Sequence, residues 1–526
     1  MEINLNFAAL FTNMKKSIII SLERLFVVLA MSFLLPGSIF TQSGIIGTCG
    51  TSIEDQMIIK QRMMENREAA NGIVMPRSGA IKYIPVRYHL YAKNDGTGRL
   101  TTKNVFDNLC AINKLYADQD IVFYLKEIKR PNNTNIYTDP SATTSAASLS
   151  SLANGSANHN AINIFVASKA NASEPGVLAF YSPNGDYIVA DMNYVNSKGT
   201  TLAHEIGHYF SLAHTFFGWE CGTFDPQDPP NNVCSNILTE YYDRTKLYAN
   251  GKLHCNIAAD GFCDTQADYN LGFGWNGSCQ WSGNVDDPAG HILDPDEDNM
   301  MSYFLNCLAV FSSEQKSAIN LDYNSPRRSY LRTPVYTPKS SISSAVNYTT
   351  PLDSVWSYDS VYFKWEPVTN ADNYYVEVSE LFGFTLNTIS WTTTRVDTVL
   401  RNLKPSKRYY WRVIPYNSNS VCFTPTVKSF YNTSVKTASD DVYLNSWNAS
   451  LRFDLENREL VLISNETIDQ VELKIYNPEG KISSRQIVSL EDGSVSLGSG
   501  NQAAGLYFYT LEARNRKTQT GKIFIP

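Results

Sequence analysis

Residues 199–216 read GTTLAHEIGHYFSLAHTF and contain three of the seven histidines of the chain, His204, His208 and His214. On an α-helix, His204 and His208 stand four residues apart and therefore project from the same face. That spacing allows two imidazoles to bind one Zn²⁺. Glu205 follows the first of them and is placed to act as general base on a metal-activated water.

His214 is predicted to be the third ligand. On a continuous helix it would lie about 15 Å from His204, so we expect the helix to end after His208 and the chain to turn back. A catalytic zinc keeps three protein ligands and one open position, which HExxHxxxxxH supplies. The alternative is a helix that merely carries surface histidines. At average residue frequencies, chance gives the whole pattern in roughly a few chains per ten thousand.

The segment HEIGHYFSLAHTF resembles the zinc-binding motif of the metzincin metalloproteases, and its trailing HTF resembles the pappalysin (ulilysin-like) branch. The resemblance covers roughly residues 80–330 and implies an α+β catalytic domain, with a mixed twisted sheet plus the zinc helix. The family usually has glycine at the position of Ser211, where the helix ends. Glycine adopts positive φ freely. Either Ser211 tolerates a strained backbone or the turn is rebuilt.

A metzincin also has a methionine turn beneath the metal. Residues 298–303, DNMMSY, match the family's N-x-M-x-Y form. The resemblance implies that Met301 is the turn methionine and that Tyr303 faces the metal and stabilises the oxyanion of the tetrahedral intermediate. Without the upstream zinc motif, adjacent Met and Tyr residues would more often indicate an ordinary core.

Two further motifs resemble pappalysin elements. Residues 260–265, DGFCDT, are similar to the family's DxxxDTP loop, which helps to bind structural Ca²⁺ in relatives, although Gln266 replaces the proline. Asp260 and Thr265 are the implied calcium ligands, and a solvated acidic loop is the alternative. Cys49, in GTCGT, resembles the cysteine by which such zymogens block their own zinc. Alternatively, Cys49 pairs with Cys110 or is simply free.

Nine cysteines are present, and six of them fall between residues 221 and 307, a stretch without clear periodicity. In an exported chain, that density predicts disulfides that tie down long loops. Pairing cannot be deduced from spacing, and Cys221–Cys234 is the local pair that we expect. A second zinc site is the alternative, but the sequence has no CxxC pair.

The N-terminal segment has the character of an export signal, with two basic residues followed by the apolar run Leu25–Leu35 and then Pro36. Eleven apolar-rich residues are too few to span a bilayer, so we predict a signal peptide over residues 1–41 and no transmembrane segment. Residues 42–78 are charged and helix-prone, as in a propeptide. A net charge of −7 and a pI near 5.6 argue against a nucleic-acid partner.

Residues 79–335 have the pattern of the catalytic domain. Alternating or apolar runs predict strands at Tyr83–Tyr91, Ile121–Leu125 and Ile162–Ala167, and helical spacing predicts a helix capped at Thr102. In metzincins, the edge strand before the zinc helix pairs with the extended substrate, and Gly176–Phe180 stands at that position. Relatives that cut beside Arg place a carboxylate just after the methionine turn, and this chain has none there.

The C-terminal part changes to short alternating strands with aromatic residues, which predicts two all-β sandwich domains. Residues 345–436 resemble a fibronectin type III module, and residues 443–526 resemble the C-terminal sorting domain of type IX secretion substrates. The second resemblance implies the type IX secretion machinery as a partner and a secreted or cell-surface location. For residues 443–526, one more structural sandwich is the alternative.

These features predict a secreted zinc-dependent endopeptidase that acts on protein or peptide substrates. An alternative of another class is an inactive zinc-bearing adhesin whose β modules bind a host protein or a glycan. Glu205 argues against the adhesin, because a purely structural zinc site needs no base. A third reading is metal-dependent hydrolysis of something other than peptides.

Overall fold

The computed structural model describes most of the chain from residue 48 onward. The described residues are 48–71, 79–220, 234, 237–273, 275, 279–304, 307, 309–434, 447, 449–454, 459–464, 467–490, 493–498, 502–513, 516 and 518–526. The predicted signal peptide, Cys221 and residues 72–78 of the predicted propeptide lie outside these ranges.

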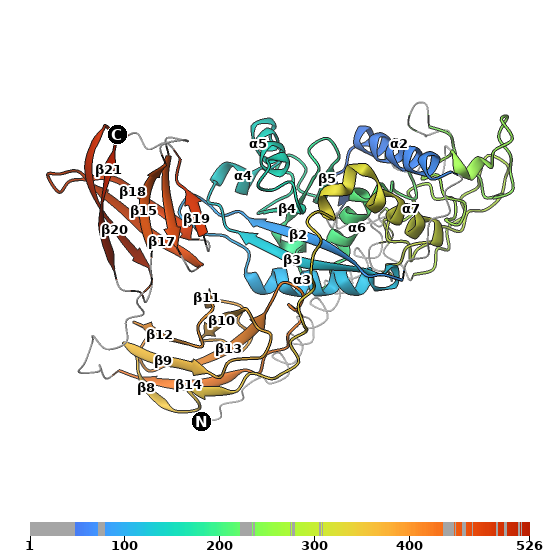
Figure 1. The fold of residues 1–526 in the computed structure, drawn as a ribbon. Coiled ribbons are helices and arrows are strands. Elements are labelled where there is room, and N and C mark those ends of the chain that lie inside the picture. The colour runs from blue at the N-terminus through green and yellow to red at the C-terminus, as the bar shows by residue number, and fades with distance from the viewer. Residues whose placement is uncertain are drawn as a thin grey trace, which may run out of the picture. The chain divides into compact units, whose positions relative to one another are not determined.

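A mixed six-stranded sheet, in the order β1-β5-β6-β4-β2-β3, carries the N-terminal half of the described chain (Figure 1). Its strands are β1 (Thr48–Cys49), β2 (Lys82–Leu90), β3 (Ile121–Lys129), β4 (Ile162–Ala167), β5 (Val177–Ser182) and β6 (Tyr187–Asp191). β2 runs parallel to β3 and β4, and β4 runs parallel to β6. β5 runs antiparallel to β6 and pairs in parallel with β1. The expected mixed sheet is therefore present, and β1 covers the expected substrate-binding edge.

Six α-helices and four 3₁₀ turns surround this sheet in the described residues. They are α2 (Ile53–Ala69), α3 (Thr102–Leu115), α4 (Thr134–Thr138), α5 (Thr143–Asn154), α6 (Thr200–Tyr209), α7 (Ser313–Asn324), η1 (Ala117–Gln119), η2 (Met192–Tyr194), η3 (His254–Asn256) and η4 (Pro326–Leu331). The cap of α3 is Thr101, one residue before the expected Thr102. Its hydroxyl accepts a hydrogen bond from the amide of Asn104.

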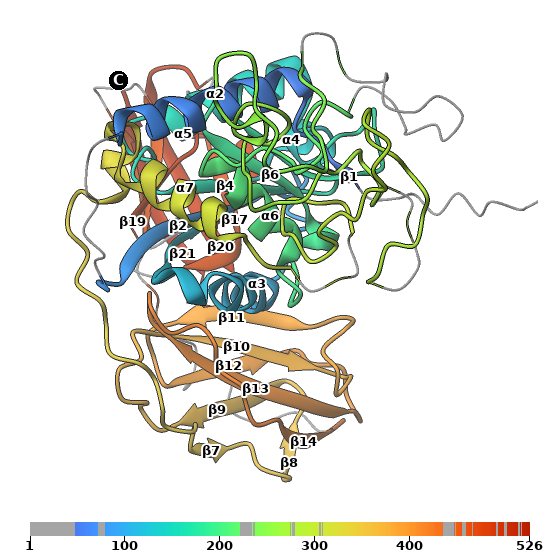
Figure 2. The same ribbon diagram turned by 90° about the vertical axis from the view of Figure 1, so that its right-hand side faces the viewer.

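One apolar core joins the sheet to the helices that carry the site. Its members include Val86 and Tyr88 of β2, Val105 and Leu109 of α3, Leu202 and Ile206 of α6, and Met301. β4 is buried along its whole length, as its mostly apolar sequence predicts, and its one polar residue, Asn163, is buried as well. Helix α2, which lies in the predicted propeptide, contributes Ile59 and Met63 to this core and packs against α7 (Figures 1 and 2).

The C-terminal part is built from β-strands, as expected. One sheet contains β7 (Tyr348–Thr350), β8 (Val355–Ser357), β9 (Ser360–Trp365), β10 (Asn373–Ser379), β11 (Ile389–Thr393), β12 (Asp397–Arg401), β13 (Arg408–Tyr416) and β14 (Lys428–Thr433). Trp365, Leu403, Tyr409 and Trp411 lie in its buried core.

Two smaller sheets follow. They contain β15 (Ala449–Asp454), β16 (Glu459–Ser464) and β19 (Gly493–Ser496), and β17 (Ile468–Tyr476), β18 (Ile482–Leu490), β20 (Gly505–Ala513) and β21 (Gln519–Ile525). Leu451 and Leu462 from the first sheet share one core with Leu473 and Leu511 from the second, which makes this unit a sandwich.

Three disulfides join described cysteines: Cys110–Cys422, Cys255–Cys263 and Cys279–Cys307. Two of them tie down the irregular stretch, as expected: Cys255–Cys263 ends inside the predicted calcium loop, and Cys279–Cys307 follows it. Cys110 bonds to a cysteine 312 residues away, so the alternative pairing of Cys110 with Cys49 is excluded. Cys49 is free.

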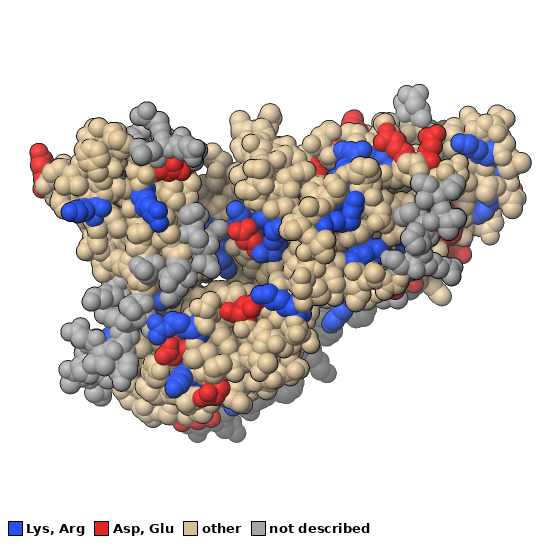
Figure 3. Space-filling view, in the orientation of Figure 1, with Lys and Arg blue, Asp and Glu red and all other residues tan. Residues whose placement is uncertain are grey.

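On the face drawn in Figure 3, acidic and basic side chains are interspersed rather than gathered by sign. Among the described residues, no helix is both long enough and apolar enough to cross a membrane.

Candidate active site and metal centre

The end of α6 decides where the three histidines point. His204, Glu205 and His208 lie on α6 and are buried. The helix stops at Phe210, and Ser211 adopts φ 67°. The amide of Leu212 then donates to the carbonyl of Gly207 at 3.0 Å. Ser211 therefore takes the left-handed conformation that glycine would adopt more easily, and the turn is not rebuilt.

The methionine turn lies directly against α6. Met301 is fully buried, and a Cβ added to Gly207 would lie 2.5 Å from its sulfur. The amide of Thr215 donates to the carbonyl of Met301 at 3.2 Å. The structure therefore places Met301 against α6 and the segment that carries His214, and its role as the turn methionine stays a prediction.

Hydrogen bonds orient all three imidazole rings. The Nδ1 atom of His204 lies 2.7 Å from the carbonyl oxygen of Met300, and that of His208 lies 2.7 Å from the carbonyl oxygen of Leu212. The Nδ1 atom of His214 lies 3.1 Å from Oε1 of Glu220. Because each of these partners is an acceptor, each Nδ1 carries the proton, and each Nε2 presents a lone pair.

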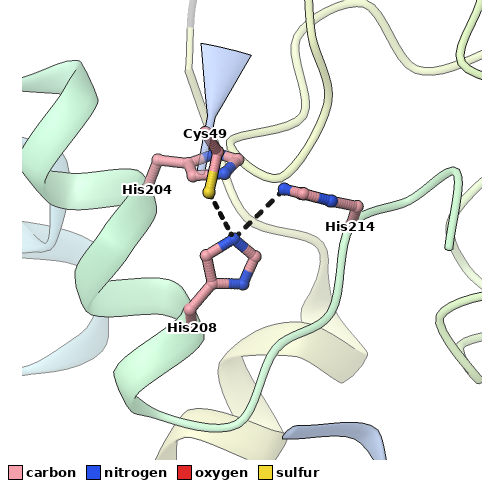
Figure 4. Close-up of side chains that lie close together, drawn as sticks. All are labelled: Cys49, His204, His208 and His214. Carbon is pink, nitrogen blue, oxygen red and sulfur yellow. Dashed lines mark hydrogen bonds between the residues drawn. The ribbon is translucent and has the colours of Figure 1, made fainter. Parts of the chain in front are cut away.

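The three Nε2 atoms converge with the sulfur of Cys49 (Figure 4). The Nε2 atoms of His208 and His214 are 3.2 Å apart, and Sγ of Cys49 lies 3.4 Å from Nε2 of His208. The ligand atoms of all four residues lie within 4.8 Å of one another. Nε2 of His204 is buried without a hydrogen-bond partner among the described residues.

This donor set fits a zinc ion. With Zn–N bonds of about 2.05 Å and a Zn–S bond of about 2.3 Å, a tetrahedral site has N···N edges of about 3.3 Å and N···S edges of about 3.6 Å. The two distances given above are close to these edges. Lone pairs that face one another at such distances repel unless a cation lies between them. Burial also lowers the pKa of His204 to about 4, so its ring is neutral and can bind a metal.

Glu205 lies beside this cluster. Burial raises the pKa of its carboxyl to about 8, although Cys49 and Thr51 oppose the shift through hydrogen bonds. Oε2 of Glu205 accepts from the hydroxyl of Thr51 at 3.4 Å and lies 3.6 Å from Sγ of Cys49. A dication next to the carboxylate would lower this pKa again. A carboxylate whose proton affinity depends on such neighbours suits general acid–base chemistry.

The hydroxyl of Tyr303 contacts the backbone of Cys49. It accepts from the amide at 3.2 Å and donates to the carbonyl oxygen at 3.2 Å. Burial raises the pKa of Tyr303 well above its ordinary value, so the phenol stays protonated and can donate. The Tyr303 ring also lies 6.4 Å from that of His204 and 5.1 Å from that of His214, between ring centres, and its role toward an oxyanion stays a prediction.

Three residues at the site were missed by sequence reasoning. Glu220 contacts Nδ1 of His214. The sequence offered a signal for it, because histidines that bind a metal commonly contact a carboxylate and Glu220 follows the predicted ligand closely. Thr51 contacts Glu205. Gln56, on α2, accepts from the amide of His214 at 3.2 Å, and its Nε2 lies 3.3 Å from Nε2 of His208. No sequence pattern marks Thr51 or Gln56.

A cation from outside the predicted calcium loop, Arg244, lies beside it. The hydroxyl of Thr265 donates to both carboxylate oxygens of Asp260, at 3.2 and 3.1 Å. The guanidinium of Arg244 donates to Glu240 at 2.5 Å and to the carbonyl oxygen of Thr265. Among the described residues, three or more metal-type ligands come together only at Cys49 and the three histidines. Calcium binding by Asp260 and Thr265 thus stays a prediction.

A cleft of about 320 Å³ opens beside the histidines. His204, Glu205 and Tyr303 line it, together with Lys198 and Phe304. The edge strand β5 borders this region, where β1 lies in the expected place of an extended substrate. A peptide could therefore pair with this edge of β5 only after β1 leaves.

Comparison with solved structures gave weak likenesses. A point mutant of promirolysin from Tannerella forsythia has a TM-score of 0.32 and 17% identity, and the match covers 54% of this chain and 96% of that chain. The FN1–FN3 domains of chicken CNTN1 have a TM-score of 0.15 and 15% identity, covering 36% of this chain and 67% of that chain. At such scores, neither likeness carries an argument. Comparison with curated proteins gave no match.

The family comparison is more informative. Residues 148–318 match the model of peptidase family M43, described as Pregnancy-associated plasma protein-A. This segment holds β4, β5, β6, the three histidines, Glu205 and the methionine turn. Residues 148–318 are thus similar to the M43 peptidases, and the match supports a metalloprotease.

Proposed function

We propose that the chain is a zinc-dependent endopeptidase of the metzincin class, with His204, His208 and His214 as the metal ligands. The observation that carries the proposal is the convergence of three neutral, oriented imidazoles beside the buried carboxylate of Glu205. When bound, zinc would act as a Lewis acid toward the scissile carbonyl and would acidify the attacking water.

The protein groups have separate roles in this reaction. Glu205 accepts the proton of the attacking water and then delivers it to the leaving amine. Tyr303 donates a hydrogen bond to the oxyanion of the tetrahedral intermediate, in the way that it now donates to the carbonyl oxygen of Cys49. β5 holds the peptide by backbone hydrogen bonds, which accept many sequences.

The described chain is the latent form in this proposal. The thiol of Cys49 stands where a catalytic zinc keeps its open position. Burial, followed by the Glu205 charge, raises the pKa of this thiol, whereas a bound dication would favour the thiolate. Residues 42–78 would be the propeptide, and its removal would open the site.

The location and the C-terminal modules are proposed from the sequence alone. An export signal over residues 1–41 would direct the chain out of the cytoplasm. The fibronectin type III-like module would be structural, and residues 443–526 would be recognised by type IX secretion machinery, leaving the enzyme secreted or at the cell surface. Structural calcium at Asp260 and Thr265 belongs to the same proposal.

Casein hydrolysis by wild type and Glu205→Ala tests the function, with zinc content measured on the same samples. Glu205→Ala should retain stoichiometric zinc and lose activity by about 10²–10⁴-fold, the range for a general base. Glu174→Ala, an exposed position, is the matched control and should behave as wild type. Equal activity of Glu205→Ala and wild type would remove the protease and favour the adhesin. Activity on small esters alone would indicate a different hydrolase.

A further inference from the structure

Ser211 is strained and buried at the point on which the third ligand depends. Its φ of 67° is one that L-residues rarely adopt, and its side chain is 2% exposed. His214 follows three residues later, so the conformation of Ser211 sets the direction in which the chain delivers that imidazole. A strained residue persists only where its surroundings hold it.

A buried ion pair holds Ser211. The hydroxyl of Ser211 donates to Oδ1 of Asp322, at 3.0 Å, and Oδ2 of Asp322 accepts from Nε of Arg328 at 2.8 Å. The side chains of Asp322 and Arg328 are both fully buried. A paired and hydrogen-bonded charge is costly to disturb, because removing one partner leaves the other buried without compensation.

The guanidinium of Arg328 also fixes the end of the zinc helix. It donates to the carbonyl oxygen of Tyr209, the last residue of α6, and lies over the Tyr209 ring at 3.7 Å from its centre. Its Nη1 atom donates to Asp186, in the turn between β5 and β6, at 2.7 Å. One cation therefore ties together the helix end, the turn at Ser211 and the hairpin that contains the edge strand.

We propose that Ser211, Asp322 and Arg328 are positioning residues that set the third zinc ligand, His214. Glycine would adopt this turn freely, whereas Ser211 is held in it by the hydrogen bond from its hydroxyl to the buried Asp322–Arg328 ion pair. None of the three touches the metal or the substrate, so each acts through His214. This inference rests on the proposed zinc site.

The test compares Ser211→Ala with Ser211→Gly in the full-length chain. Alanine keeps the strain and loses the anchor, whereas glycine loses the anchor but adopts the turn freely. Zinc affinity by chelator competition should fall at least tenfold in Ser211→Ala and less in Ser211→Gly. The visible spectrum of the cobalt-substituted protein should shift in Ser211→Ala, because the ligand geometry changes; a merely structural role would leave it unmoved.

The matched controls are Ser406→Ala and Ser406→Gly. Ser406 has φ 57° but is exposed, after β12 and outside the catalytic part. Neither control should change zinc affinity or the cobalt spectrum. Asp322→Asn should weaken zinc binding. Adding Ser211→Ala to Asp322→Asn should reduce the zinc affinity by a smaller factor than Ser211→Ala does in the wild-type background.

Wild-type zinc affinity and spectrum in a folded Ser211→Ala would overturn the inference. If Ser211→Ala does not fold, Ser211→Gly decides, since glycine suits the turn: weakened zinc binding supports the inference, and unchanged binding with an unchanged spectrum overturns it. Failure of the proposed function is distinguishable, because wild type would then bind no stoichiometric zinc or would not cleave casein.

Discussion

Gly207 lies on α6 immediately before His208, and replacing it with alanine should disturb the methionine turn. A Cβ at this position would lie 2.5 Å from Sδ of Met301, 3.3 Å from its Cε and 3.5 Å from Cε1 of Phe311. The sulfur is thus about 0.9 Å inside the 3.4 Å at which ordinary van der Waals contact begins. Met301 is fully buried, so it cannot swing into solvent.

Two opposing effects determine how Gly207→Ala changes the free energy of unfolding. Alanine in place of glycine inside a helix stabilises it by about 1 kcal/mol. Overpacking a buried site costs about 1–3 kcal/mol, so the unfolding free energy should fall by about 1 kcal/mol. Zinc binding should suffer as well, because the carbonyl of Met300, next to the displaced residue, orients His204 at 2.7 Å. We expect at least a tenfold loss of zinc affinity, which corresponds to about 1.4 kcal/mol.

Thermal unfolding of the zinc-free protein and chelator competition measure the two quantities separately. Met301→Ala, which removes the sulfur, should recover part of the zinc affinity when it is combined with Gly207→Ala. Gly383→Ala is the matched control, since its Cβ would meet only a methyl of Thr385 at 3.6 Å. If Gly207→Ala were more stable than wild type and bound zinc equally well, the packing of Met301 against the zinc helix would not constrain the site as we argue.

Two further predictions concern the latent state and the ligands. Cys49→Ala should shorten the lag before full-length protein becomes active on casein, because no thiol then blocks the histidines; an unchanged lag would count against the cysteine as the block. Glu220→Gln keeps the size of the side chain but removes the charge that faces His214, so zinc affinity should fall about 10–100-fold by chelator competition. Equal zinc affinities of Glu220→Gln and wild type would show that the Glu220 charge is not needed once backbone carbonyls orient His204 and His208.

The three histidines could be predicted from the sequence because their geometry is local. His204 and His208 share one helical turn, and any path that brings His214 back must turn near Ser211. Glu220 was within reach of the same reasoning, since it follows His214 by six residues. By contrast, Asp322 and Arg328 reach the turn from α7 and η4, more than a hundred residues away, and no spacing rule connects them to it.

The fold shows the same division between local and long-range information. The buried strand Ile162–Ala167 and the helix around Val105 follow from periodicity, whereas Cys110–Cys422 joins two segments that no local pattern relates. The calcium motif illustrates a different limit. Asp260 and Thr265 do contact one another, but the nearby Arg244 supplies positive charge from a residue outside the motif.

Latency in the proposed function involves more than the metal ligands, because residues 49–56 engage each reactive group in turn. The thiol of Cys49 lies against His208. The backbone amide and carbonyl of Cys49 both form hydrogen bonds with the hydroxyl of Tyr303. The hydroxyl of Thr51 binds the carboxylate of Glu205. Gln56 contacts both His208 and the amide of His214. Oxidising or replacing the thiol alone would therefore leave the base and the oxyanion donor occupied, and full activity requires β1 to leave the sheet edge.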